Sequence, residues 1–89
     1  TNLFKRLYYL RQKEMSVKEY TEEFYRLTIR LGHIEDDAEK VARYLNGLRL
    51  TIQDEIDILM PKSVEEAYRV ALRAEEKLSR RYDQISRGR

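Results

Sequence analysis

The stretch SVKEYTEEFYRLTIRLG, residues 16–32, decides the fold because it contains one helix with signals for both of its ends. Ser16 and Glu19 form a capping-box pattern, in which each side chain accepts a hydrogen bond from the other residue's backbone N–H. Gly32 is placed to end the helix in the left-handed conformation. Apolar residues recur between these ends at spacings of three and four, the pattern of one buried helix face: Val17, Tyr20, Phe24, Leu27 and Leu31.

Two further helices are predicted on either side of this one. The first covers about residues 2–12, with Asn2 as its cap and Leu3, Leu7 and Leu10 on one face. The other begins near residue 36 with the box-like pair Asp36 and Glu39, whose negative charges favour a helix start. Gly47 followed by Leu48 predicts that this helix ends in a Schellman turn.

The C-terminal half predicts a short helix and a long one. Thr51 is the expected cap of the short helix, which ends near Leu59 because Pro61 follows. Ser63 and Glu66 form a third capping box, and the helix that starts there is expected to fray near Tyr82.

Five helices joined by short turns predict an all-α fold, a compact bundle with a thin core. We expect residues 1–78 to form the domain and residues 79–89 a basic, partly disordered tail. The predicted core consists of Leu7, Leu10, Val17, Tyr20, Phe24, Leu27, Val41, Leu45, Leu48, Ile52, Ile56, Val64, Ala67, Ala71 and Leu72.

The composition excludes several classes of function. The 89 residues are enough for one domain, or for part of a larger chain, but not for two domains. With no cysteine these residues form no disulfide, no thiolate zinc site and no thiol-based catalytic site. No apolar run approaches the roughly 18 residues of a membrane span. The 18 basic and 16 acidic residues are too evenly balanced to indicate a nucleic-acid or membrane partner from net charge alone.

No pattern in the chain indicates catalysis. The one histidine, His33, follows Gly32 in a predicted turn and is read as a surface residue without a nucleophilic partner. Asp36, Asp37 and Glu39 lack the spacing of a calcium loop and are read as helix-start acids. We therefore expect no catalytic residue, no cofactor, no metal and no small-molecule substrate.

Three stretches together resemble the Gag proteins of Ty3/gypsy-type retrotransposons over nearly the whole chain. LRQ at residues 10–12 and SVKEYTEEFYRL at 16–27 resemble the region that corresponds to the major homology region of retroviral capsids. ARYLNGL at 42–48, with IQDE at 52–55, is also similar to Gag. So is SVEEAY at 63–68, leading to AEEKL at 74–78.

This resemblance implies a capsid C-terminal domain, either of a retrotransposon Gag or of a domesticated protein derived from one, which dimerises and joins capsid subunits into a particle shell without catalysing a reaction. In the family a Gln and an acidic residue hold a turn against the following helix, and by this match they are Gln12 and Glu19. The retroviral sequences place Gly after that Gln, where this chain has Lys13. The matched homology-region core is Val17, Tyr20, Phe24 and Leu27. The next helix would make the two-fold contact, with candidate residues Asp37, Lys40, Val41, Arg43 and Tyr44.

The basic C-terminal segment leaves a second class of function open. Residues 77–89 carry five basic residues against one acidic residue: Lys77, Arg80, Arg81, Arg87 and Arg89 against Asp83. The alternative hypothesis is a small helical module that binds nucleic acid through this tail. If the chain is Gag, we expect RNA to bind through neighbouring Gag segments, or weakly through the tail. We expect a homo-oligomer in an intracellular, cytoplasmic particle, with no membrane contact.

Overall fold

The structure is a computed structural model that describes residues 3–32 and 36–87, except for the side chains of Phe4 and residues 83–87. Within these ranges all regular structure is helical, which confirms the all-α prediction. The elements are, in chain order, α1 (Leu3–Tyr8), α2 (Val17–Leu31), α3 (Asp37–Gly47), α4 (Leu50–Ile56), the 3-10 turn η1 (Asp57–Leu59) and α5 (Val64–Arg87).

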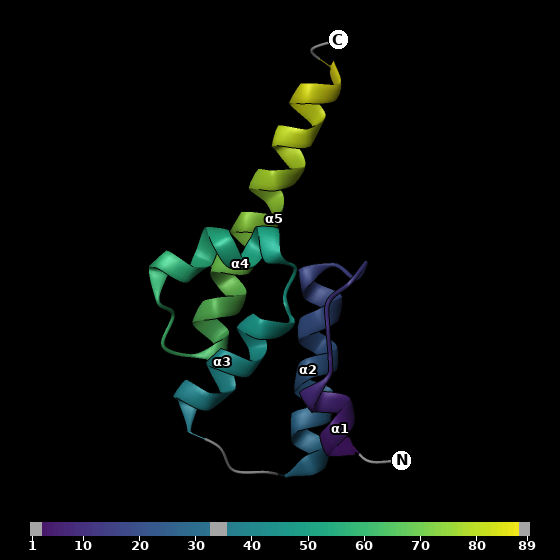
Figure 1. Ribbon diagram of the computed structural model, residues 1–89, viewed down its shortest axis with the longest axis vertical. Coiled ribbons are helices and arrows are strands. Elements are labelled where there is room, and N and C mark those ends of the chain that lie inside the picture. Colours follow the sequence, from purple (N-terminus) through teal and green to yellow (C-terminus); the bar gives the residue numbers. More distant parts are fainter. Residues whose placement is uncertain (1–2, 33–35, 88–89) are drawn as a thin grey trace.

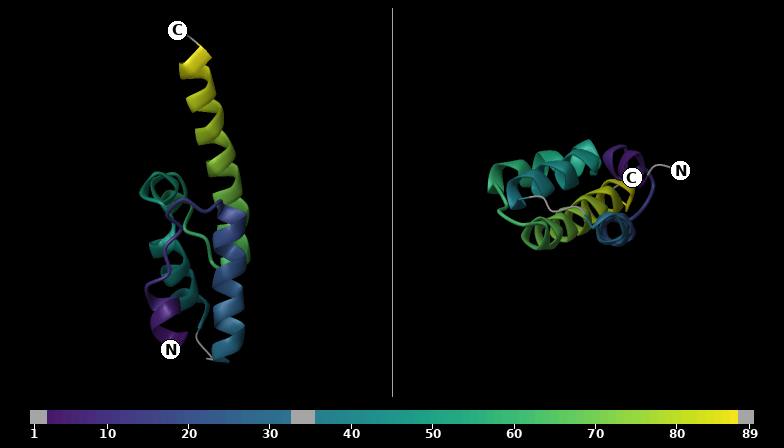
Figure 2. Two further views of the ribbon diagram at one scale, coloured as in Figure 1. Left: turned by 90° about the vertical axis from the view of Figure 1, so that its right-hand side faces the viewer. Right: turned by 90° about the horizontal axis from the view of Figure 1, so that it is seen from below.

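The helices form two layers in a flat, elongated molecule. α1, α3 and α4 lie on one side, and α2 and α5 on the other (Figure 2). The Cα atoms extend over 49 × 28 × 15 Å, and the short dimension leaves room for only two helices in depth. The second half of α5 projects beyond the other helices (Figure 1), and α5 continues to Arg87, past the expected fraying point at Tyr82.

Most helix ends follow the local sequence signals. Ser16 and Glu19 make both hydrogen bonds of the capping box, from the Glu19 N–H to Ser16 Oγ over 3.1 Å and from the Ser16 N–H to Glu19 Oε1 over 2.9 Å. Asp36 accepts from the Glu39 N–H at 2.8 Å. Gly32 has the predicted left-handed conformation, with φ of 59°. Local capping therefore fixes the limits of the long helices.

Three local predictions are wrong. α1 ends at Tyr8 rather than near residue 12, because the chain leaves the helix there and runs alongside α2 (Figure 1) to the end of α3, where the Gln12 N–H donates to the Gly47 carbonyl. Thr51 is not the cap of α4, which begins at Leu50 with Arg49 as a cap residue that makes no side-chain capping bond. Gly47 is the last residue of α3 and has no positive φ. Asn2 and His33, to which we assigned a cap and a surface position, lie outside the described residues.

The buried core largely follows the predicted stripes. Leu10 and Leu45 are half-buried instead, and Leu72 is wrongly assigned because 37% of it is exposed. Small alanines hold α5 close to the other helices, and Tyr44 is fully buried. The buried apolar residues are Leu7, Val17, Tyr20, Phe24, Leu27, Val41, Tyr44, Leu48, Ile52, Ile56, Val64, Ala67, Ala71 and Ala74.

Gly47 is required by close packing. A Cβ atom at this position would lie 2.0 Å from Tyr20 Oη and 2.8 Å from the carbonyl oxygen of Leu10. The second of these atoms belongs to the backbone, so a rotamer change cannot relieve the clash. The end of α3 thus touches both α2 and the residues that follow α1, and only glycine allows this distance.

We predict that Gly47→Ala lowers the free energy of unfolding by about 3 kcal/mol, because the methyl group must displace packed atoms. Gly32→Ala is the matched control, since a Cβ there meets no atom within 4 Å and only the positive φ is unfavourable. It should cost about 1–2 kcal/mol. Urea denaturation followed by circular dichroism measures both, and a larger loss for Gly32→Ala would contradict the packing argument.

Candidate functional site

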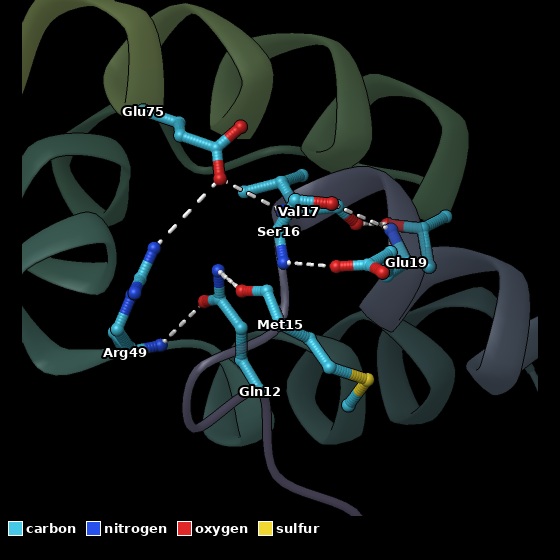
Figure 3. A network of polar contacts seen from close by, with 8 residues as sticks. Gln12, Met15, Ser16, Val17, Glu19, Arg49 and Glu75 are labelled. Atoms are coloured by element: carbon cyan, nitrogen blue, oxygen red, sulfur yellow. Dashed lines mark hydrogen bonds and ion pairs between the residues drawn. The ribbon is translucent and has the colours of Figure 1, made fainter. Parts of the chain in front are cut away.

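The segment between α1 and α2, residues 9–16, is held by one buried side chain. Gln12 is fully buried, and its Nε2 donates to the Met15 carbonyl over 3.0 Å. Its Oε1 accepts from the Arg49 N–H at 2.9 Å, as Figure 3 shows. The Gln12 backbone N–H donates to the Gly47 carbonyl over 2.7 Å. A single glutamine therefore closes this turn and fastens it to the corner between α3 and α4.

Glu75 of α5 completes the same network from the opposite layer. Its Oε2 accepts from the Val17 N–H at 2.9 Å and lies 3.7 Å from Nη2 of Arg49 (Figure 3). Val17 is the first residue of α2, so the carboxylate occupies the positive end of that helix. Nothing near Glu75 in the sequence indicates this role, since its partner Val17 lies 58 residues away.

Gln12 and Glu19, the predicted polar pair, bind to different groups. Glu19 is exposed and completes the capping box with Ser16, whereas the Gln12 side chain bonds to Met15 and Arg49 (Figure 3) and its backbone N–H to Gly47. Lys13, at the position where retroviral sequences have Gly, adopts a left-handed φ of 48°. The backbone thus has the conformation that favours Gly, although a lysine occupies it.

The homology-region aromatics join α2 to α3 inside the core. The rings of Phe24 and Tyr44 meet edge to face, 5.3 Å apart, and Tyr20 lies 5.3 Å from Tyr44. Tyr20 Oη donates to the Tyr44 carbonyl over 2.8 Å. The Thr21 hydroxyl donates to the Val17 carbonyl, so the Tyr44 hydroxyl donates to Thr21 Oγ1 over 2.6 Å. Burial raises the pKa of both phenols well above the ordinary value.

The candidate dimer helix, α3, has two different apolar sides. Tyr44 is fully buried in the core, so it cannot contact a partner, which corrects its assignment to the dimer contact. Asp37 is exposed, and Lys40 and Arg43 are half-buried on the flanks. Val41 is buried with Tyr44 in the core, and the side of α3 that carries Ala38, Ala42 and Leu45 borders an open groove of about 770 Å³. The groove is lined by Ala38, Val41, Ala42, Leu45, Asp57, Leu59, Met60, Pro61 and Lys62.

The basic residues of the predicted tail are partly neutralised where the structure describes their side chains. Lys77 Nζ and Arg81 Nη1 lie 3.1 and 3.4 Å from the carboxylate of Glu55 on α4. Arg80 lies 3.7 Å from Glu76. The side chains of Arg87 and Arg89 are outside the described part. Glu55 of α4 thus pairs with two basic residues at the start of the projecting half of α5.

A search with models of protein families matches residues 4–78 to the family described as PEG10/RTL1, C-terminal capsid-like domain. The chain belongs to this family. The match confirms the resemblance, because this is a Gag-derived capsid domain of Ty3/gypsy origin. A search of curated proteins and a search of solved structures each found no significant match.

Two features of this PEG10/RTL1-type domain bear on its chemistry. Among the residues that the structure describes, no three His, Cys, Asp or Glu side chains are grouped to hold a metal ion. No helix within the same residues is long and apolar enough to cross a membrane. The capsid-like domain exposes the groove beside α3 and the helix faces around it, which are surfaces that a protein partner could contact.

We predict that Gln12→Ala destabilises the capsid-like domain by about 2–4 kcal/mol. The change leaves the Arg49 N–H and the Met15 carbonyl without partners inside the protein. Glu75→Gln is the control, because the amide oxygen still accepts from Val17 and only the attraction to half-exposed Arg49 is lost. It should cost no more than about 1 kcal/mol in urea denaturation, and equal losses for the two variants would contradict this assignment.

We also predict alkaline destabilisation of the capsid-like domain. The folded state keeps Tyr20 and Tyr44 protonated, whereas their phenols in the unfolded chain ionise near pH 10. Above that pH the unfolded state binds fewer protons, so stability falls as pH rises, by up to about 2.7 kcal/mol per pH unit for the two residues. Denaturation at pH 8 to 11 measures the slope. Tyr44→Phe should halve it, and an unchanged slope would show that the burial of Tyr44 is not the cause.

Proposed function

We propose that this domain is a non-enzymatic self-association module of a Gag-derived capsid protein. It forms dimers and joins capsid subunits into a particle shell in the cytoplasm. The observation that carries the proposal is the open apolar groove beside α3, which no other element of the described chain covers. Membership in a capsid-like family supports a structural role rather than a catalytic one.

The groove is suited to meeting a copy of itself. Ala38 and Ala42 are one helical turn apart on α3 and exposed, and their small size allows a second helix to approach closely. Leu59 and Met60, on its other wall, are 55% and 77% exposed. Leu59 and Met60 together form an apolar ridge, and a two-fold axis through the groove would place the ridge of each copy against the alanines of the other.

Charges at the rim fit the same arrangement. Asp57 and Lys62 lie at the groove and carry opposite charges. In an isologous contact, Asp57 of one copy can pair with Lys62 of the other in both directions. The proposed contact therefore uses Ala38, Ala42 and the ridge, rather than Lys40 and Arg43.

Met60→Asp tests this interface without harming the fold. Met60 has a left-handed φ of 48°, a conformation that aspartate tolerates better than methionine, and its side chain is exposed. We expect the variant to keep its helical content and stability while its dimer dissociation constant rises at least about tenfold, since two apolar contacts are lost and two charges face each other. Equilibrium sedimentation from micromolar to millimolar protein measures the constant.

Ile29→Asp is the matched control for this measurement. Ile29 is also apolar and 76% exposed, but it lies on α2, in the other layer. Its replacement should leave dimerisation unchanged. If the wild-type chain is strictly monomeric at millimolar concentration, the proposed function is wrong. If the two variants weaken dimerisation equally, the groove is not the dimer contact.

A further inference from the structure

The N-terminal segment, residues 3–13, carries positive charge and contains no acidic residue. Residues 3–13 contain four basic residues, Lys5, Arg6, Arg11 and Lys13, all of them exposed. Residues 14–76, by contrast, contain fifteen acidic and nine basic residues. The segment is therefore positively charged and precedes an acidic middle part of the chain, and its exposed cations can attract a polyanion.

Two tyrosines stand exposed in the middle of this segment. Tyr8 and Tyr9 are 54% and 66% exposed, and their rings meet edge to face with centroids 5.1 Å apart. Tyr20 and Tyr44, in contrast, are fully buried. Exposed aromatic rings between cations form the surface on which unpaired bases stack, because each base offers a π face and each phosphate a negative charge.

An open groove links Tyr8 to Arg43, a cation on α3. Arg11 Nη1 donates to the Leu10 carbonyl over 2.9 Å and lies 3.4 Å from the Tyr8 carbonyl, which keeps its guanidinium beside Tyr8. Tyr8, Arg11 and Arg43 line the groove, which has a volume of about 320 Å³. Its other lining residues are Glu39, Ala42 and Asn46. The two arginines outnumber the single carboxylate, so the groove favours anions.

We propose that this tyrosine–arginine surface, comprising Tyr8, Tyr9, Arg11, Lys13 and Arg43, binds single-stranded nucleic acid. Bases stack on the two tyrosines while the cations pair with phosphates. A duplex is a poorer ligand because its bases are already stacked and paired. α1 and α3 lie in the half of the molecule away from the projecting end of α5 (Figure 1), so this assignment differs from binding through the C-terminal tail.

The proposal does not rest on dimerisation, although the two surfaces are neighbours. Ala42 lines both the tyrosine–arginine groove and the apolar groove beside α3. A dimer formed through α3 would carry two tyrosine–arginine surfaces, and both could bind one long strand, which would increase the overall affinity. Measuring the Met60→Asp variant alongside the wild type separates the two proposals, because a short oligonucleotide should still bind to the monomer.

Fluorescence anisotropy tests the surface with labelled twelve-nucleotide U12 RNA, dT12 DNA and a twelve-base-pair duplex at 50 mM NaCl. We expect both single strands to bind at least fivefold more tightly than the duplex, and the comparison of U12 with dT12 reports any ribose contact. Tyr9→Ala should weaken single-strand binding about 5- to 100-fold, whereas Tyr9→Phe, which keeps the ring, should bind like the wild type. Tyr82→Ala, at an equally exposed tyrosine on α5, should have no effect.

The salt dependence tests the charges independently. At most five cations can contact phosphates: Lys5, Arg6, Arg11, Lys13 and Arg43. A plot of the logarithm of the binding constant for a single strand against the logarithm of the salt concentration should therefore have a slope no steeper than about −3.5. Arg11→Gln should make the slope shallower by about 0.7, and Arg69→Gln, an exposed arginine of α5, should not change it. The proposal is overturned if the duplex binds equally well, if Tyr9→Ala binds like the wild type, or if Arg80→Gln with Arg81→Gln abolishes binding instead.

Discussion

The structure depends on the crossing between the turn at residues 9–16 and the corner that joins α3 to α4. Both segments are irregular backbone, and where they meet their polar groups are shielded from water. Gln12 satisfies these groups with its side chain and its own N–H, while Gly47 permits the contact because it has no Cβ. Without both residues the turn could not lie against this corner, whereas α1 itself is also held by Leu7, which is buried in the core.

Local signals in the sequence predict the helices well because the capping bonds they encode are themselves local. Ser16, Asp36 and Ser63 each bond within three residues, and each starts a helix where expected. The prediction that Thr51 caps α4 is wrong because a distant residue sets the start of this helix. The Arg49 N–H donates to the Gln12 side chain, 37 residues away, and this contact is not visible in the local sequence. Gly47 misleads in the same way, since glycine is needed there for contact with Tyr20 rather than for a turn.

The candidate site is predictable only where resemblance supplies what spacing does not. The family pattern points to Gln12, although nothing around that residue in the sequence shows that it is buried. Glu75 is missed because charge alone does not distinguish it from Glu76, which is exposed and pairs with Arg80. On α3, Val41 and Tyr44 form one apolar stripe and Ala38, Ala42 and Leu45 another. Periodicity identifies both stripes but not which of them faces the core.

The apolar ridge of Leu59 and Met60, at the end of η1, combines two features that are unfavourable for an isolated chain. Met60 adopts a left-handed backbone conformation, which costs a non-glycine residue about 1–2 kcal/mol. Its apolar side chain, and that of Ile58 beside it, are 77% and 83% exposed to water. Neither feature contributes to the core, because the buried residues before them end at Ile56. If a second copy covered this ridge, its apolar side chains would be removed from water, which is energetically favourable. Self-association through the ridge would therefore bury apolar surface that the monomer leaves exposed.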